Sequence, residues 1–274
     1  KFGINADLVD FDDIENCKKA LKPETKLIYS EVFANPTLNI ADIPALAEIA
    51  HKNGALLMID NTFSSPIAIK PIKFGADIVI NSMTKFMNGH SDAIAGSITS
   101  TEEIIDAIHP VRMLCGTPGD PHAAHAMMKS FATMDLRIKK QMASAAKLAK
   151  ALEENKYVSK VNHPSLKSFK HHDLALELFG SNETMSGMIS FIVPEDSEKI
   201  DKFMLKLNFA HYAMTLGGIR TTLVHPVTSS HSHMPDEARR AMGITPGLFR
   251  LSVGIEDVDD LIADFTQALE VFGE

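Results

Sequence analysis

The chain has 274 residues, of which 45% are hydrophobic and 23% charged, and its formal net charge at pH 7 is −8. This composition is typical of a globular protein with room for roughly two domains. The acidic balance argues against nucleic acid as a partner, because proteins that bind the phosphate backbone need clustered Lys and Arg. No apolar run approaches the roughly 20 residues of a membrane span. Two cysteines are too few for a disulfide framework, so we expect a cytoplasmic protein with no membrane contact.

The first 80 residues alternate helical patterns with short apolar runs. Periodicity and stop signals predict helices over residues 12–21 and 43–51. Apolar runs predict buried strands over residues 26–30, 55–59 and 78–80. This alternation implies a parallel sheet, whose strands all end at one edge.

Two of these strands end in side chains that can do chemistry. Asp60 ends the second strand, and the third continues into Ser82, Thr84 and Lys85. Open α/β sheets bind ligands at this edge. Hydroxyl groups suit phosphate oxygens, and a deprotonated amine is a nucleophile towards a carbonyl. Taken singly, Asp60 also fits a helix cap, and the Ser-x-Thr-Lys sequence also fits a polar loop with a solvated lysine.

Taken together, these residues narrow the chemistry. A lysine for a carbonyl, an acid for a protonated ring nitrogen and hydroxyls for a phosphate are the parts of a pyridoxal 5'-phosphate (PLP) site. Asn35, in the loop over residues 31–37, adds an amide for a ligand, although Asn-Pro is also a common turn. The sequence therefore predicts PLP as the cofactor.

The second half of the chain predicts further helices and strands. A long helical pattern covers residues 122–154 without a gap, and later helices are predicted over residues 197–207 and 257–272. Strands are predicted over residues 157–161, 187–193 and 247–254.

Two alternative kinds of site are disfavoured. His225, His231 and His233 are metal-ligand types, but they have no metal-ligand spacing and no acid cluster, so we expect no metal site. No Gly-x-Gly-x-x-Gly sequence follows any predicted strand, which disfavours a dinucleotide-binding domain.

Four motifs in order resemble the Cys/Met-metabolism family of PLP-dependent enzymes. They are Asn35-Pro36, Asp60-Asn61-Thr62-Phe63, Ser82-Met83-Thr84-Lys85 with Gly89-His90, and Arg250-Leu251-Ser252-Val253-Gly254-Ile255-Glu256. The resemblance implies the fold-type-I α/β architecture, with a mostly parallel sheet in a large PLP domain at residues 1–136 and a smaller α+β domain at residues 137–274. It also implies a homotetramer of catalytic dimers, and an N-terminal portion of the large domain that this chain lacks.

The resemblance also assigns roles on the cofactor side. Lys85 matches the Schiff-base lysine that shuttles protons, and Asp60 matches the acid on the pyridine nitrogen. Ser82 and Thr84 match the phosphate-binding hydroxyls, and Asn35 matches the amide beside the cofactor's phenolic oxygen.

On the substrate side, Arg250 matches the arginine that binds the α-carboxylate through a bidentate fork. Thr215 falls where the family usually has a serine near the substrate. One departure stands out, because Ala132 replaces a lysine of the family pattern and changes the hydrogen bonding available there.

The predicted function is therefore PLP-dependent γ-elimination or γ-replacement on a sulfur amino acid or O-acyl-homoserine. Two stretches, residues 30–39 and 255–261, are most similar to methionine γ-lyase and O-acetylhomoserine sulfhydrylase. Cystathionine γ-lyase, β-lyase and γ-synthase are alternative assignments. A hypothesis from another class is a non-catalytic fragment or degenerate homologue that serves as an assembly module.

Overall fold

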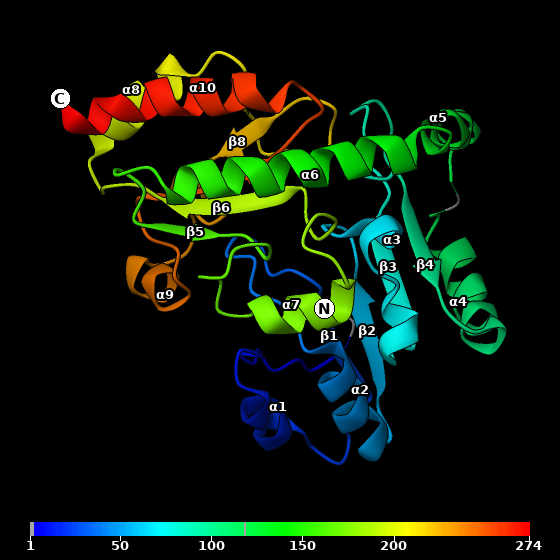
Figure 1. The fold of residues 1–274 in the computed structure, drawn as a ribbon. Helices are drawn as coiled ribbons and strands as arrows, with labels where there is room; N and C mark the ends of the chain where they lie inside the picture. Colours follow the sequence, from blue (N-terminus) through cyan, green and yellow to red (C-terminus); the bar gives the residue numbers. More distant parts are fainter. Residues whose placement is uncertain (1–2, 118) are drawn as a thin grey trace.

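The computed structural model describes residues 3–117 and 119–274, and it forms an α/β fold around two sheets (Figure 1). The first sheet has the strand order β1-β2-β3-β4, with β1 at Leu27–Glu31, β2 at Leu56–Asp60, β3 at Ile78–Ser82 and β4 at Gly96–Thr99. The first three strands are parallel, as the sequence predicts, and β4 adds an unpredicted antiparallel edge.

The second sheet is mostly antiparallel. Its order is β5-β6-β9-β8-β7, with β5 at Lys160–Asn162, β6 at Met188–Ile192, β7 at His211–Tyr212, β8 at Thr222–Val224 and β9 at Leu248–Ser252. Strand β5 begins three residues later than the predicted strand, because the backbone turns at residues 155–158. β6 and β9 lie within their predicted ranges.

The helices of the first half follow their capping residues. Asp13 accepts a hydrogen bond from the Glu15 backbone N–H at the start of α1, and Asp42 accepts one from Ala45 at the start of α2. These bonds satisfy N–H groups that no carbonyl of the helix can reach. The helices are α1 (Ile14–Ala20), α2 (Ile43–Lys52), α3 (Ser65–Ala68) and α4 (Glu102–Leu114), with the 3-10 turn η1 at Pro71–Phe74.

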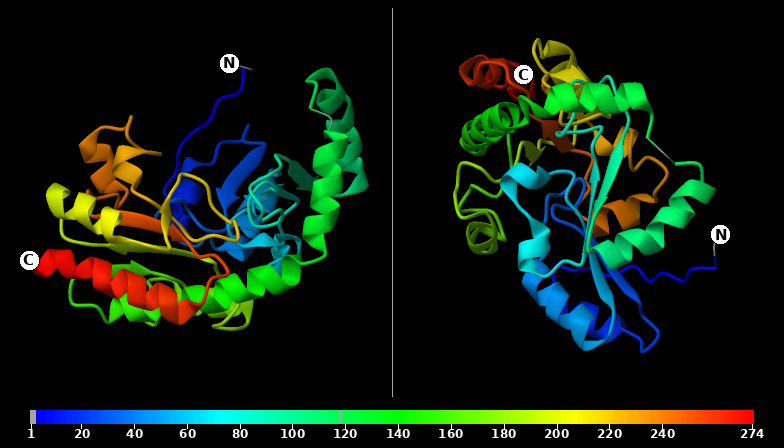
Figure 2. Two further views of the ribbon diagram at one scale, coloured as in Figure 1. Left: turned by 90° about the horizontal axis from the view of Figure 1, so that it is seen from above. Right: turned by 90° about the vertical axis from the view of Figure 1, so that its right-hand side faces the viewer.

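The helical pattern over residues 122–154, predicted as one helix, forms two: α5 (Pro121–Phe131) and α6 (Met134–Glu153). The prediction of one continuous helix is therefore wrong. Thr133 N donates to Ser130 O at 3.3 Å, a bond to the carbonyl three residues back that ends α5. Ser130 O also accepts from the Arg137 side chain, which occupies the carbonyl that a continuous helix would use. Figure 2 shows α5 turned sharply away from the axis of α6.

Helices α6 and α10 lie side by side against the second sheet (Figure 1). Phe191 and Phe249 of that sheet stack with ring centroids 5.6 Å apart, and Phe203 of α8 and Phe265 of α10 pack on them. The remaining helices are α7 (His172–Phe179), α8 (Ser197–Lys206), α9 (Asp236–Ala241) and α10 (Val258–Leu269), with η2 at Pro226–Thr228 and η3 at Glu270–Gly273.

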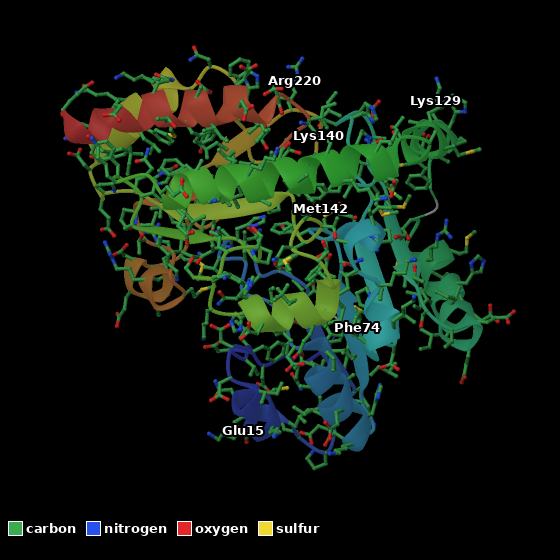
Figure 3. The ribbon with its side chains drawn as sticks, in the orientation of Figure 1. Glu15, Phe74, Lys129, Lys140, Met142 and Arg220 are labelled. Carbon is green, nitrogen blue, oxygen red and sulfur yellow. The ribbon has the colours of Figure 1, made fainter. Side chains whose placement is uncertain are left out.

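Helix α6 itself is amphipathic. Met142 is 1% exposed and faces the core, whereas Lys140 is exposed to solvent (Figure 3). The buried apolar residues form one continuous cluster that includes both sheets. Within residues 3–117 and 119–274, no helix is long and apolar enough to cross a membrane.

The two faces of the first sheet differ, although the sequence predicts buried strands. Helix α2 covers one face, where Leu57 and Ile59 are fully buried. On the other face Tyr29 is 47% exposed and Leu56 is 38% exposed. Asp60 lies on this open face, because side chains alternate along a strand.

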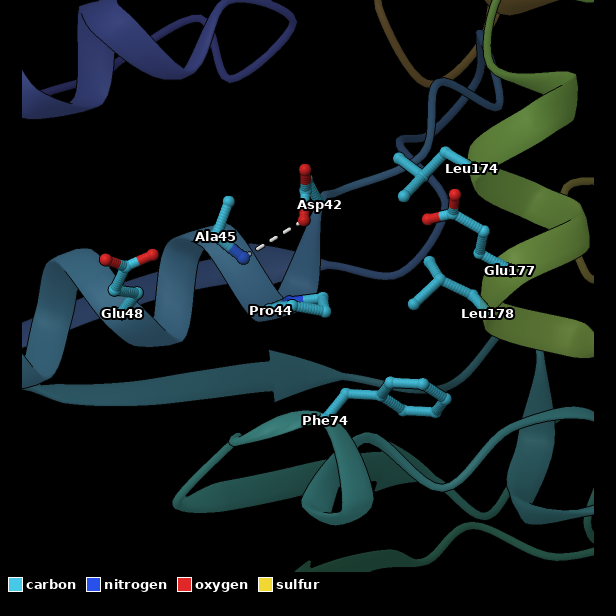
Figure 4. Close-up of a pocket in the computed structure, with 8 residues that line it drawn as sticks. All are labelled: Asp42, Pro44, Ala45, Glu48, Phe74, Leu174, Glu177 and Leu178. Carbon is cyan, nitrogen blue, oxygen red and sulfur yellow. Dashed lines mark hydrogen bonds between the residues drawn. The ribbon is translucent and has the colours of Figure 1, made fainter.

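A cleft between α2 and α7 lies apart from the predicted site residues (Figure 4). Phe74, Leu174 and Leu178 supply its apolar wall, and its polar wall consists of the carboxylates of Asp42, Glu48 and Glu177. The Asp42 carboxylate is already engaged in capping α2. None of the residues that line this cleft is a predicted site residue.

Candidate active site

The strand ends of the first sheet bring Asp60 and Ser82 together through Thr62. Asp60 Oδ1 accepts a hydrogen bond from Thr62 N at 2.8 Å, and Thr62 Oγ1 accepts one from Ser82 N at 2.8 Å. Asp60 pairs with Ile80 in the parallel register of β2 and β3, so Ser82 extends just beyond it. The structure therefore places both residues at one sheet edge, on the half-exposed face.

Glu31, which the sequence-based prediction missed, lies directly opposite Asp60 in the register of β1 and β2. Burial raises the pKa of the Glu31 carboxyl group, the hydrogen bond from Asn35 N lowers it, and the nearby Asp60 charge raises it further. The pKa of the Tyr29 phenol is raised to about 12, mainly by burial and further by the negative charges of Asp60 and Glu31. The position of Glu31 in the sequence could have identified it as a site residue, because it too ends a strand of the parallel sheet.

Lys85 lies on a tight turn that follows β3. Its N–H donates to Ser82 O at 3.1 Å, and its carbonyl accepts from Gly89 N at 2.7 Å. The side chain is half-buried. Burial lowers the pKa of the Lys85 amine, and the positive charge of Arg250 lowers it further. A neutral amine is the form that attacks a carbonyl or accepts a proton.

The two predicted phosphate-binding hydroxyls have different surroundings. Thr84 Oγ1 donates to Ala95 O at 3.3 Å and accepts from Ala95 N at 3.1 Å, so its proton is already used within the fold. Among the described residues, none makes a hydrogen bond to the Ser82 hydroxyl. A phosphate dianion only accepts hydrogen bonds, which makes Ser82 the better available donor.

Arg250 is 4% exposed and lies in the middle of β9. Its Nη1 donates to Asn35 Oδ1 at 2.9 Å, and its Nη2 donates to Met214 O at 3.2 Å. Its Nε has no partner, and no acid in the described part of the chain forms a salt bridge with it. Burial lowers the pKa of the guanidinium to about 10. Arg250 is therefore a buried cation with a free donor and no counterion.

The loop that contains Thr215 packs on the lysine turn. Gly217 has φ of +75°, and a Cβ atom there would lie 2.4 Å from Phe86 N and 2.8 Å from the carbonyl carbon of Lys85. Only glycine permits this approach. Thr215 lies two residues earlier and accepts a bond at its carbonyl from Thr222 Oγ1. In the described residues, Thr215 makes no hydrogen bond to Lys85 or Arg250, although Arg250 Nη2 donates to the carbonyl of the adjacent Met214.

The histidines of the later loop separate into different roles. His225 Nε2 lies 2.6 Å from Pro246 O, and its ring packs on Phe249. Burial lowers the pKa of His231, and the positive charges of Arg250 and Arg239 lower it further. The described residues contain no cluster of three or more metal-ligating side chains.

The comparisons with known proteins cover almost the entire chain. The model of the family described as "Cys/Met metabolism PLP-dependent enzyme" matches residues 1–270. The chain is 38% identical over 274 residues to an L-methionine gamma-lyase of Treponema denticola, with 98% of this chain and 68% of that protein aligned. It is 38% identical over 271 residues to a cystathionine beta-lyase of Lactococcus lactis, and 37% identical over 271 residues to a cystathionine gamma-lyase of Bacillus subtilis. Each of these two alignments covers 98% of this chain and 70% of the relative.

Proposed function

The chain belongs to the Cys/Met metabolism family of PLP-dependent enzymes, and from that premise we propose that it cleaves or exchanges the γ-substituent of a sulfur amino acid. The observation that carries this proposal is the buried, counterion-free Arg250 beside the half-buried Lys85. A buried cation without a partner is unfavourable, and an amino-acid carboxylate is a matching counterion.

The residues present fit PLP. The free donors are the Ser82 hydroxyl and Arg250 Nε, and the acid at the same edge is Asp60. When bound, PLP supplies an aldehyde that condenses with amines and a cationic ring that withdraws electron density from the substrate α-carbon.

Each residue then has a distinct task. Lys85, with its lowered pKa, would hold the cofactor and accept the α-proton. Asp60 would keep the ring nitrogen protonated, and Ser82 would donate to the phosphate. Arg250 would bind the α-carboxylate, with Asn35 holding its guanidinium in place at 2.9 Å. Thr84 is proposed as the second phosphate-binding hydroxyl, although it also bonds Ala95, and Thr215 is proposed to contribute a hydroxyl near the substrate.

The relatives carry the names of three different reactions at similar identity. Methionine γ-lyase-like or O-acetylhomoserine sulfhydrylase-like γ-chemistry remains our proposal, with cystathionine γ-lyase, β-lyase and γ-synthase as alternatives. The hypothesis of a non-catalytic assembly module is disfavoured, because Lys85, Asp60 and Arg250 are all retained in the sequence.

We also propose the domain division at residues 1–136 and 137–274, and a homotetramer built from catalytic dimers. The proposed assembly is supported by α4, which has no buried residue although it carries Leu114 at 88% and Met113 at 58% exposure. A cytoplasmic location is proposed because Cys17 and Cys115 are both free thiols.

The proposed function is tested by supplying PLP and comparing methionine, cystathionine, and O-acetylhomoserine with sulfide as substrates. The expected result is a 2-oxo acid or a new thioether from at least one of them. Absence of turnover with PLP bound at Lys85 would favour the assembly module instead.

A further inference from the structure

Helix α6 carries two buried polar side chains one turn apart, Arg137 and Gln141, which are 6% and 0% exposed. Residues four apart lie on the same face of a helix. This face is directed at the candidate site, and the two side chains reach different halves of it.

Arg137 holds the turn that carries Lys85. Its Nη1 donates to Phe86 O at 3.1 Å and its Nη2 to Met87 O at 3.1 Å, so it binds the two carbonyls directly after the lysine. A Cβ atom on Gly89 would lie 1.9 Å from Nη1, so the guanidinium fills the space that a side chain would need. Within the described part of the chain, no salt bridge joins Arg137 to an acid. Its other two hydrogen bonds, from Nε to Thr133 Oγ1 and from Nη2 to Ser130 O, hold the guanidinium at the corner between α5 and α6.

Gln141 holds the substrate half. Its Nε2 donates to Gly218 O at 2.8 Å and to Val253 O at 3.0 Å. Gly218 follows the glycine that packs on the lysine turn, and Val253 follows the strand that carries Arg250. One amide group therefore joins the substrate loop to the end of β9.

We propose that α6 sets the spacing between Lys85 and Arg250, with Arg137 positioning the lysine turn and Gln141 positioning the substrate strand. This inference rests on the proposed roles of Lys85 and Arg250. Apolar side chains of similar size would pack the helix equally well, since buried polar groups add little net stability. Unlike apolar packing, directional hydrogen bonds fix the position of the helix relative to both halves of the site.

Three variants of α6 test the proposal: Arg137→Gln, Gln141→Leu and the control Lys140→Gln. Lys140 lies between the other two in sequence but on the exposed face of the helix. Lys85 is followed without cofactor by competitive acetylation over a range of pH with mass spectrometry. Substrate binding is followed by titration with L-alanine, which has no γ-substituent to lose. Turnover is expressed per mole of bound PLP, with the thermal midpoint measured alongside.

Arg137→Gln should raise the pH at which Lys85 reacts, because the relaxed turn exposes the amine, and should lower kcat roughly tenfold at nearly unchanged KM. Gln141→Leu should weaken alanine binding and raise KM roughly tenfold, with Lys85 reactivity unchanged. Lys140→Gln should change none of these quantities.

A lower thermal midpoint in both variants, with Lys85 reactivity, KM and kcat per bound PLP as in the wild type, would overturn the proposal and leave a packing role only. If Arg137→Gln does not fold, Arg137→Lys replaces it. That variant reaches fewer carbonyls, so an intermediate kcat is expected and a wild-type value would overturn the role of Arg137. A wild type that fails to attach PLP at Lys85 would instead contradict the proposed function, whatever the α6 variants do.

Discussion

The two sheets contribute to the candidate site in different ways. In the first sheet, the contacts that place Asp60 and Ser82 span 2 and 20 residues of sequence, and the residues lie at the ends of parallel strands. In the second sheet, Arg250 lies in the middle of an antiparallel strand, and its side-chain partners are 36 and 215 residues away. Topology alone aligns the first set, whereas the second enters the site only because the two sheets pack together.

Burial also has different consequences for the two cations that meet between the sheets. It lowers the pKa of the Lys85 amine, which increases the fraction of the reactive neutral form. The pKa of Arg250 falls to about 10, so its guanidinium stays charged near neutral pH. The same desolvation therefore favours a neutral base on one side, and on the other it leaves an unpaired charge that a substrate anion would stabilise.

The largest expected effect is on the cofactor side. Lys85→Ala should lower turnover at least about 10²–10⁴-fold, because it removes both the attachment point and the proposed base. Borohydride reduction and peptide mapping of the wild type should place the phosphopyridoxyl label on Lys85. The exposed Lys129 on α5 provides the control substitution, Lys129→Ala, which should keep label and turnover. A wild-type label on any other lysine contradicts the assignment.

Asp60→Asn should come next, with turnover reduced roughly 10²–10³-fold at similar PLP occupancy. The amide cannot hold a proton on the ring nitrogen. Glu31→Gln is the matched control on the neighbouring strand, because it retains an acceptor for Asn35 N and should change turnover little. Equal turnover in Asp60→Asn and wild type would show that Asp60 serves only as a turn residue.

Arg250→Lys tests the substrate side and should weaken amino-acid binding roughly ten- to a hundredfold, with PLP attachment unchanged. A lysine cannot reproduce the fork of the guanidinium, and it loses the bond to Asn35 or that to Met214. Titration of the cofactor absorbance with L-alanine measures the affinity. Unchanged affinity would show that another group binds the carboxylate.

A smaller effect should separate the two hydroxyls. Ser82→Ala should weaken PLP binding by about 0.5–1.5 kcal/mol with little loss of stability, because its hydroxyl has no partner in the described fold. Thr84→Ala should instead lower the thermal midpoint, because it removes both bonds to Ala95. PLP affinity and the thermal midpoint are measured on both variants. A larger loss of PLP affinity in Thr84→Ala than in Ser82→Ala would show that Thr84 is the phosphate donor.

The same contrast explains what the sequence predicts well. The parallel order of β1, β2 and β3 follows from alternating helices and apolar runs, and it was enough to bring Asp60 and Ser82 to one edge. The helices predicted over residues 12–21 and 43–51 match α1 and α2 to within about two residues at each end, because local periodicity and stop signals set them. The corner between α5 and α6 was not predictable by periodicity, because it depends on the Arg137 bond to Ser130 O.

Contacts across the two sheets were beyond local patterns as well. The motifs named Asn35 and Arg250 through the family resemblance, yet nothing in their spacing predicts the 2.9 Å bond between them. Glu31, Arg137 and Gln141 are charged or polar residues in otherwise ordinary positions, and only tertiary packing shows that they face the site.

The smallest expected effect links the two sheets through charge. Arg250→Gln removes the second cause of the lowered Lys85 pKa, so that pKa should rise but stay below its ordinary value of 10.5, since burial, the larger cause, remains. In wild type without cofactor, the unfolded chain binds more protons at Lys85 than the folded chain between the lowered pKa and 10.5. The contribution of Lys85 to stability therefore rises with pH through that window, and Arg250→Gln should make the rise shallower.

Urea unfolding at several pH values, together with acetylation of Lys85, measures both effects, with Arg112→Gln on the exposed face of α4 as the control. A Lys85 pKa that does not move would mean that Arg250 and Lys85 are too far apart, or too well solvated, to interact, and burial alone would then make the lysine reactive.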